Sequence, residues 1–315
     1  MEGAYYNGQY LNRLERLGYS QAEIDNKLES TFEEMFYGPE GVRLCHCAGP
    51  DMMYIEDTGN HDVRTEGMSY AMMFCVQMNR QKEFDCLWRW VVTHMYLTEG
   101  ENAGYFAWSC HTDGSKNSDG PAPDGEEFFA MSLFFAANRW GSGEGVLDYA
   151  SWARRILHAC VHKGEEAGSG FPMWNPENHL IKFIPNCEFT DPSYHLPHFY
   201  ELFALWSDEC DRPFWHAAAA ASRQYLRKAC HARTGLSAEY AEYDGRPHRG
   251  DQPDRHDWFF SDAYRTLGNI ALDAQWFGDK DGWAQETAAH IQQFFEEKEH
   301  GQTNGIYLID GTPVE

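Results

Sequence analysis

Basic residues are scarce in this chain of 315 residues. Only 25 Lys and Arg stand against 49 Asp and Glu, which gives a net charge of −24. A surface that binds nucleic acid needs a basic patch to neutralise phosphates, and an anionic membrane surface likewise attracts basic segments. The composition therefore argues against nucleic acid and against a membrane as partners.

Long apolar runs and linkers are also lacking. No stretch approaches 18 apolar residues, and no basic segment precedes an apolar one at the N-terminus, so we expect neither a spanning helix nor a signal peptide. Without a Pro- or Ser-rich linker, residues 1–315 are predicted to form a single domain. The nine cysteines are scattered through expected helices, which is typical of reduced core residues in a cytoplasmic protein.

Signals for metals and cofactors are weak. No Gly-rich phosphate loop follows a strand, and "LCHCAG" at 44–49 has no second cysteine pair. His158 and His162 in "HACVH" have the spacing of two ligands on one helix face, but we expect no supporting acid close to them, and the helix has the pattern of an outer one. We therefore predict no metal and no cofactor. His195 and His198 in "HLPHF" are expected to shape a loop or to hydrogen-bond to substrate.

Aromatic residues are plentiful, with 11 Trp, 17 Tyr and 20 Phe making up 15% of the chain. Most must serve the core. In combination with the acidic excess they also suit a sugar-binding cleft, where carboxylates bond to hydroxyls and flat rings stack on the sugar.

The hydrophobic pattern predicts a mostly α-helical chain. Four segments, near 66–80, 126–139, 193–207 and 261–277, are apolar on nearly every side, as in fully buried helices. Amphipathic segments alternate with them at 81–97, 148–164, 211–231 and 281–300, and 7–38 adds one or two helices that stop at Gly38. Short strands are expected only at 179–189 and 305–315. Alternation of buried and half-buried helices predicts an inner ring wrapped by an outer ring, a helical toroid.

Each apolar helix is headed by an acid: Glu66, Asp124, Asp191 and Asp262. One such acid needs no explanation beyond the helix dipole, which stabilises it by a few tenths of a kcal/mol or more. In a toroid, however, all inner helices begin at one pole, so the four acids would gather in one pocket. Tyr194 lies beside Asp191 in the sequence. Long loops that contain Tyr105, Trp108 and Trp174 are expected to reach the same pole.

Two carboxyl groups in different environments are the minimum apparatus for hydrolysing an acetal. Glu66 is the candidate acid, because the apolar "GMSYAMM" that follows it would desolvate the carboxyl and raise its pKa. Asp262 is the candidate base, because Arg265 follows three residues later and would favour the ionised form. From spacing alone, a helix-capping role for each acid is equally compatible with the sequence.

At these residues the chain resembles glycoside hydrolase family 8. The resemblance rests on "RTEGMSYAMMF", "PAPDGEEFFAMSLFFAANRWG" and "FFSDAYR" and extends over essentially all 315 residues; "GYFAWSC", "PMWN" and "FTDPSYHLPHFYELF" are similar to the branch that releases xylose from the reducing end of xylo-oligosaccharides. It implies an all-α (α/α)6 barrel and an inverting mechanism with Glu66 as proton donor and Asp262 as proton acceptor. It also implies that Asp124 grips the distorted sugar and that Tyr194 helps to hold the attacking water.

The sequence departs from the family in three places. Pro123 stands where many members have Ser or Thr, and Glu126 where Asp is common. The chain holds about nine expected helices whereas six helical hairpins need twelve, and a His-containing loop of the exo-acting branch is not found. We therefore expect a toroid that is incomplete at the C-terminus.

Two other classes of function stay open at this point. One is another α/α-toroid sugar enzyme: an endo-acting xylanase or glucanase, or a lyase or epimerase that uses Tyr194 and His195 to abstract a proton. The other is a non-catalytic oligosaccharide-binding protein on the same scaffold.

Overall fold

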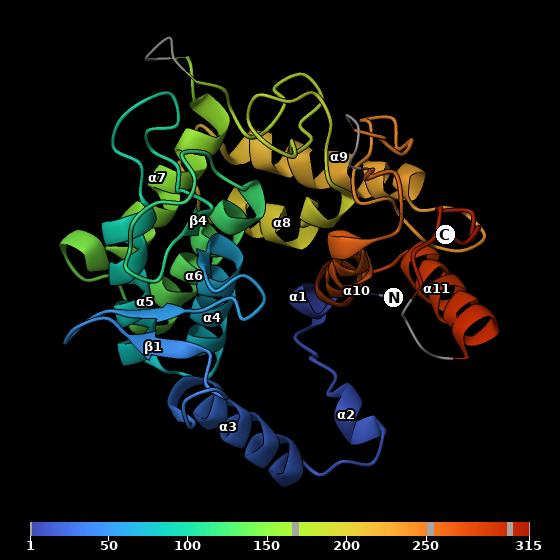
Figure 1. The fold of residues 1–315 in the computed structure, drawn as a ribbon. Coiled ribbons are helices and arrows are strands. Elements are labelled where there is room, and N and C mark those ends of the chain that lie inside the picture. Colours follow the sequence, from blue (N-terminus) through green and yellow to red (C-terminus); the bar gives the residue numbers. More distant parts are fainter. Residues whose placement is uncertain (1, 166–169, 251–254, 301–304, 315) are drawn as a thin grey trace. The chain divides into compact units, whose positions relative to one another are not determined.

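A computed structural model describes residues 2–165, 170–250, 255–300 and 305–314 (Figure 1). Contacts within the chain divide it into two compact units. The N-terminal unit comprises residues 10–159, and the C-terminal unit comprises residues 1–9 and 160–315. Each is described by itself.

The N-terminal unit is built from helices and two small antiparallel sheets. Helix α3 begins with a capping box between Ser20 and Glu23 and ends before Gly38, where the sequence predicted the stop. The helices are α2 (Arg13–Arg16), α3 (Gln21–Tyr37), α4 (Thr65–Gln77), α5 (Gln81–Trp90) with a π-helical turn at Val91–Met95, α6 (Pro123–Trp140) and α7 (Tyr149–His162), whose last three residues belong to the other unit. Strand β1 (Cys45–Cys47) pairs with β2 (Met53–Ile55), and β3 (Val63–Arg64) pairs with β4 (Ser109–Cys110).

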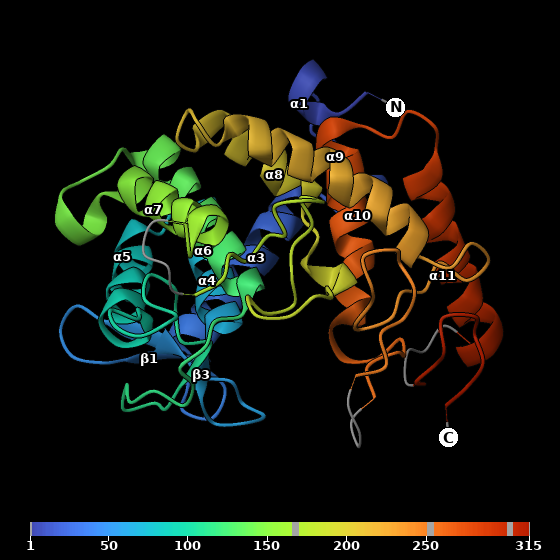
Figure 2. The ribbon, with the colours of Figure 1, turned by 90° about the horizontal axis from the view of Figure 1, so that it is seen from above.

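Helices α4 and α6 form the core of this unit and lie side by side (Figure 2). Met68, Met72 and Cys75 of α4 and Phe129 and Leu133 of α6 are all completely buried. Burial of a large apolar side chain stabilises a fold by about 1.5 to 3 kcal/mol, so a helix that is apolar all round gains most when it is enclosed on every side. The prediction that both segments are buried helices is confirmed.

In the C-terminal unit, α8 is mostly buried, but the expectation that the segment 261–277 is buried on nearly every side is wrong. Only four residues of α10 are buried, three of them polar, and Leu272 is 41% exposed. Helices α8 and α9 lie side by side, and α10 packs against α8 and α11 (Figures 1 and 2). The short α1 packs on the end of α10 so closely that a Cβ on Gly3 would lie 2.2 Å from the Trp276 carbonyl oxygen. The helices are α1 (Ala4–Asn7), α8 (Pro197–Trp206), α9 (Arg212–Ala229), α10 (Arg265–Phe277) and α11 (Trp283–Glu299), with 3-10 turns η3 (Pro192–Tyr194) and η4 (Ser261–Tyr264).

Two further details of the sequence prediction are wrong. Among the described residues of 179–189 and 305–315 there are isolated β-bridges, such as Phe259 to Tyr307, in place of strands. The helix expected over 193–207 begins only at Pro197, because a residue that precedes proline avoids the helical region and Leu196 is not helical. Asp191 caps the 3-10 turn η3, and Asp262 lies within the 3-10 turn η4, which leads into α10.

In the described part of the chain, no helix combines the length and the apolar character that crossing a bilayer requires.

Candidate active site

Glu66 lies in the first turn of α4, in a tightly bonded corner of the N-terminal unit. The Thr65 backbone N–H donates to the Trp108 carbonyl at 3.0 Å, and the Thr65 hydroxyl lies 3.3 Å from Glu66 Oε2. Asp62 braces the residue before them, since its Oδ1 accepts from Arg64 Nε at 3.0 Å and its Oδ2 accepts from the Ser109 hydroxyl at 2.9 Å. These bonds fix the backbone that carries the Glu66 carboxyl.

Three buried acids head the neighbouring helix α6. Pro123 occupies the first turn, where its missing N–H costs nothing, and Asp124, Glu126 and Glu127 follow it into the interior. Glu126 Oε1 accepts from the Phe106 backbone N–H at 3.0 Å. Burial raises the pKa of Glu126 well above its ordinary value, and the nearby charges of Asp124 and Glu66 add to the rise. Glu126 therefore lies within a cluster of carboxyl groups, in surroundings that favour its protonated form.

From the sequence, Glu126 was one of the acids ahead of this apolar helix and a departure from the family pattern, and its role was not predicted. Its buried carboxyl joins the head of α6 to the loop around Phe106, twenty residues earlier. The one available signal was its position in an otherwise apolar helix, which favours an acid that is either buried and bonded or functional.

The aromatic residues of the 105–108 loop differ in their exposure. Tyr105 is buried and its hydroxyl donates to the Ala159 carbonyl at 3.1 Å. Trp108 is partly exposed, and the Arg64 guanidinium lies 5.1 Å from its ring centroid. Trp174, in the C-terminal unit, is buried in edge contact with Trp215. Burial favours a packing role for Tyr105 and Trp174, and leaves Trp108 as the ring of the three that can meet a sugar.

The heads of α4 and α6 touch through Gly125. A Cβ at this position would lie 2.5 Å from Thr65 Cβ and 2.6 Å from its Oγ1. We expect Gly125→Ala to lower the free energy of unfolding by about 1 to 3 kcal/mol through overpacking. Gly268→Ala is the matched control, because nothing lies within 4 Å of a Cβ there and alanine favours the helix by up to about 1 kcal/mol. Circular dichroism melts should therefore shift in opposite directions, and equal shifts would contradict the close contact.

In the C-terminal unit, Asp191 caps the turn η3. Its Oδ1 accepts from the Ser193 backbone N–H at 2.6 Å, and the Asn269 side-chain amide donates to the Ser193 carbonyl at 2.7 Å. Tyr194 ends the turn, is buried, and its carbonyl accepts from the Tyr200 hydroxyl at 3.1 Å. Asn269 belongs to α10, so η3 is tied directly to the helix that follows Asp262.

Asp262 lies in η4, beside η3. Its Oδ2 is 2.8 Å from Arg265 Nη2, and its side chain is 43% exposed against 14% for Arg265. The Arg265 guanidinium also lies 5.7 Å from the centroid of the Tyr194 ring. The proximity of Arg265 to Asp262 that the spacing predicted is confirmed, and the carboxylate is both held in place and open to water.

Asp191 gives a pH-dependent prediction. Burial raises the pKa of its carboxyl from 3.8 to about 7, although Arg265 and the Ser193 bonds oppose the rise. Between about pH 4 and 7 the folded chain thus binds more protons than the unfolded chain, so its free energy of unfolding falls as pH rises. Asp191→Asn cannot ionise, so its stability relative to wild type should grow from pH 4 to pH 8, by at most about 4 kcal/mol. Urea unfolding at both pH values checks this; a difference that is independent of pH would contradict it.

His195, one residue after Tyr194, is fully buried and bonded through both ring nitrogens. Nε2 lies 3.0 Å from the Thr190 hydroxyl and Nδ1 lies 2.8 Å from the Ser222 hydroxyl. Burial lowers the pKa of His195 to about 3, so the ring is neutral. Of the two roles expected for it, this environment supports loop shaping and leaves no ring nitrogen for a substrate.

The expectation that no acid supports the "HACVH" histidines is wrong for His162. Its Nε2 lies 2.7 Å from Asp211 Oδ1 and its Nδ1 lies 2.9 Å from Glu165 Oε2. Partial burial lowers the pKa of His162, but these two hydrogen bonds raise it more, so the net shift is upward. The two carboxylates thus favour the protonated form of the His162 ring.

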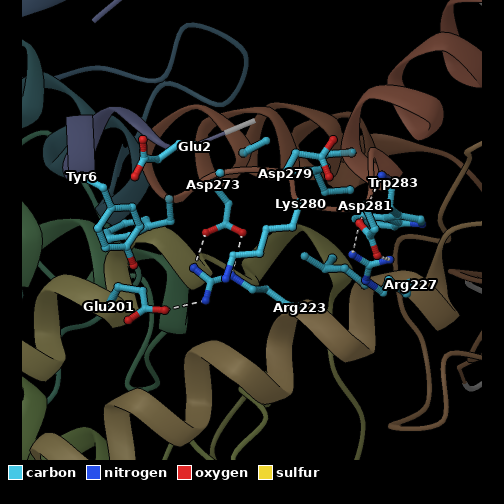
Figure 3. A pocket seen from close by; sticks show the side chains of 16 residues that line it. Glu2, Tyr6, Glu201, Arg223, Arg227, Asp273, Asp279, Lys280, Asp281 and Trp283 are labelled. Atoms are coloured by element: carbon cyan, nitrogen blue, oxygen red, sulfur yellow. Dashed lines mark hydrogen bonds and ion pairs between the residues drawn. The ribbon is translucent and has the colours of Figure 1, made fainter. Parts of the chain in front are cut away.

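Figure 3 shows a cavity of about 1010 Å³ in the same unit. It surrounds the far end of α10 from Asp262, and none of the residues predicted for the site lines it. At its centre Asp273 holds Arg223 with bonds of 2.8 and 2.7 Å, and Glu201 binds the same guanidinium from α8. The guanidinium at the centre of the cavity is thus already paired with these two acids.

The chain is similar to known proteins along nearly its whole length. The model of the glycosyl hydrolases family 8 matches residues 19–312. The "Reducing end xylose-releasing exo-oligoxylanase" of Halalkalibacterium halodurans is 54% identical over 315 residues, which are 100% of this chain and 80% of that protein. The protein of the same name from Bifidobacterium adolescentis is 55% identical over 298 residues, 95% of this chain and 76% of that protein.

The fold is also similar to that of a solved structure. Rex8A from Paenibacillus barcinonensis, complexed with xylose, superimposes with a TM-score of 0.96 at 54% identity and covers 100% of this chain and 82% of that one. The family match runs through both units, and the likeness in sequence and in fold spans the chain from end to end. The acids at the heads of its helices thus stand in a known framework, and the chain belongs to glycosyl hydrolases family 8.

Proposed function

We propose that this chain is an inverting glycoside hydrolase that cleaves β-1,4-xylosidic bonds of xylo-oligosaccharides and releases xylose from the reducing end. The observation that carries the proposal is the identity of 54 to 55%, along nearly the whole chain, with relatives named for that activity. Family membership alone would leave the sugar and the end of attack open, since one fold can host several specificities.

In the proposed mechanism, Glu66 donates a proton to the leaving oxygen while Asp262 activates the attacking water. Asp262 suits this role because it is exposed enough to hold water and Arg265 fixes its carboxylate. Tyr194 lies next to the same guanidinium and would help to hold the water. Asp124, whose charge like that of Glu66 raises the pKa of Glu126, would grip the distorted sugar.

An inverting mechanism needs room for water between its two carboxyls, about 6.5 to 9.5 Å compared with about 5 to 5.5 Å in retaining enzymes. The longer separation between Glu66 and Asp262 stays a prediction. A complex with xylotriose, solved with an inactive variant, would measure it.

The alternative of a lyase or epimerase loses its main support. It required Tyr194 and His195 to act on the substrate, but both nitrogens of His195 are engaged by Thr190 and Ser222 in the interior. The non-catalytic alternative is left to experiment.

Product analysis with xylotriose labelled with ¹³C in its reducing-end unit tests the proposal. We expect labelled xylose together with unlabelled xylobiose, and NMR should show the new reducing end first as the α-anomer, because inversion converts a β-linkage to an α-product. Label in xylobiose would place the cleavage at the other end. Unsaturated product would indicate a lyase, and no product would indicate a binding protein.

Domain organisation, partners and location complete the proposal. A family match across residues 19–312 supports one catalytic domain made from both units. The only partner proposed is the oligosaccharide. All nine cysteines are free thiols, as a cytoplasmic location would require.

A further inference from the structure

Asp62 is a buried acid that lies just before β3 and is bonded to side chains of both β3 and β4. Its own side chain is 10% exposed. Its Oδ1 accepts from Arg64 Nε at 3.0 Å, and its Oδ2 accepts from the Ser109 hydroxyl at 2.9 Å. Because Arg64 and Ser109 stand directly opposite each other in the β3–β4 pair, one carboxylate ties the two strands together through their side chains.

Both partners of Asp62 adjoin Trp108, which is partly exposed. Ser109 is the next residue in the chain, and the Arg64 guanidinium lies over the Trp108 ring, 5.1 Å from its centroid. A cation at this distance is attracted to the face of the ring. Since Asp62 fixes the guanidinium, the ring has a fixed surface to lie against on one face. A planar ring has two faces, so the other can meet a sugar.

The backbone of Trp108 is held without Asp62. Its N–H donates to the Gly120 carbonyl and its carbonyl accepts from the Thr65 N–H, both at 3.0 Å. The direction of the ring depends instead on the side-chain torsions, which have several staggered values on one backbone. Loss of Asp62 should therefore release the ring and leave the loop in place.

We propose that Asp62 is a positioning residue for the sugar site: through Arg64 and Ser109 it holds the Trp108 ring in the orientation in which a xylo-oligosaccharide stacks on it. The inference rests on the proposed function, because it presumes that the substrate lies against Trp108. Asp62 acts through its neighbours. A ring that is held beforehand need not be ordered when the sugar binds, so the expected gain is in affinity.

A double-mutant cycle on the affinity for xylotriose tests the proposal. All variants carry Glu66→Gln, so that calorimetry measures binding without turnover. Asp62→Ala should weaken binding by about two- to ten-fold, the cost of ordering one more side chain on binding, and Trp108→Ala should weaken it at least as much. If Asp62 acts through the ring, Asp62→Ala should have no further effect in the Trp108→Ala background.

Arg64→Met gives a second cycle, which decides the question if removal of Asp62 prevents folding. It keeps most of the aliphatic stem but removes the cation from the ring and the donor to Asp62. It should weaken binding only while Trp108 is present. For either cycle, an unchanged affinity in both single variants overturns the inference, and so does an equal loss with and without the Trp108 ring.

The matched control is Asp244→Ala. Asp244 Oδ2 accepts from Arg246 Nε at 2.8 Å, again two residues later in the chain, but this pair is exposed. The variant should bind xylotriose as tightly as the parent protein. A loss equal to that of Asp62→Ala would indicate a general effect of breaking aspartate–arginine pairs and would overturn the inference.

Fluorine NMR tests the position of the ring by itself. In protein labelled with 5-fluorotryptophan, the Trp108 resonance is assigned from its absence in Trp108→Phe. Asp62→Ala should shift or broaden this resonance, while the resonances of the other tryptophans, which monitor the fold, stay in place. An unchanged Trp108 resonance overturns the inference. If the wild type neither binds xylotriose nor releases xylose, the proposed function is wrong, and this spectrum still decides whether Asp62 holds the ring.

Discussion

Glu66→Gln should lower the rate of xylotriose hydrolysis by at least about 10² to 10⁴-fold, the usual contribution of a general acid. Glutamine keeps the shape of the side chain and can still accept from the Thr65 hydroxyl, but it has no proton to give to the leaving oxygen. Binding of xylotriose, measured by calorimetry, should remain close to that of wild type.

The control for Glu66 is Glu99→Gln, at an exposed position of the same unit, which should leave both rate and affinity unchanged. If Glu66→Gln kept a tenth of the activity, the proton donor would have to be another acid. The buried carboxyl of Glu126 would then be the first to replace, since its pKa is raised and it lies in the same cluster.

Asp262→Asn is expected to cost a similar factor, about 10² to 10⁴-fold in kcat, because an amide cannot take the proton of the attacking water. The variant also leaves the Arg265 guanidinium without its carboxylate at 2.8 Å, so the local geometry should loosen as well. Single-turnover measurements with saturating enzyme separate the chemical step from substrate binding.

A matched control for Asp262 lies at the other end of α10. Asp281 forms a comparable aspartate–arginine pair with Arg227 at 2.9 Å on the surface, and Asp281→Asn should be fully active. Equal losses in the two variants would indicate a general effect of breaking ion pairs, and full activity of Asp262→Asn would exclude it as the base.

The sequence predicted the all-α class well, because its strongest signal was periodicity. Segments such as α6, apolar on every side, can satisfy that pattern only when enclosed, and family membership with a TM-score of 0.96 over the chain bears out the predicted (α/α)6 class. The ends of helices and the short strands depend on single residues and could not be predicted from periodicity. Pro197 moved the start of α8, and two-residue strands such as β3 are too brief to leave a pattern.

For the site, the sequence could indicate acids at helix starts but not their partners. The bond between His195 and Ser222 and that between Asn269 and the Ser193 carbonyl join residues more than twenty positions apart, and no periodic signal connects them. The positive φ of Ser261 could not be predicted either, because a serine in a turn gives no indication in the sequence of a left-handed backbone. Catalytic roles could be assigned from the resemblance, whereas the supporting contacts required the fold.

The link between Asn269 and the Ser193 carbonyl bears on how the site responds to temperature. Because Asn269 belongs to the helix that continues from η4, the turns that carry Tyr194 and Asp262 are mounted on one rigid support. Thermal displacement of α10 carries both turns in the same direction, so the spacing between the water-holding tyrosine and the base is conserved while the helix moves. On warming, the spacing between Tyr194 and Asp262 should therefore stay constant until α10 itself unfolds.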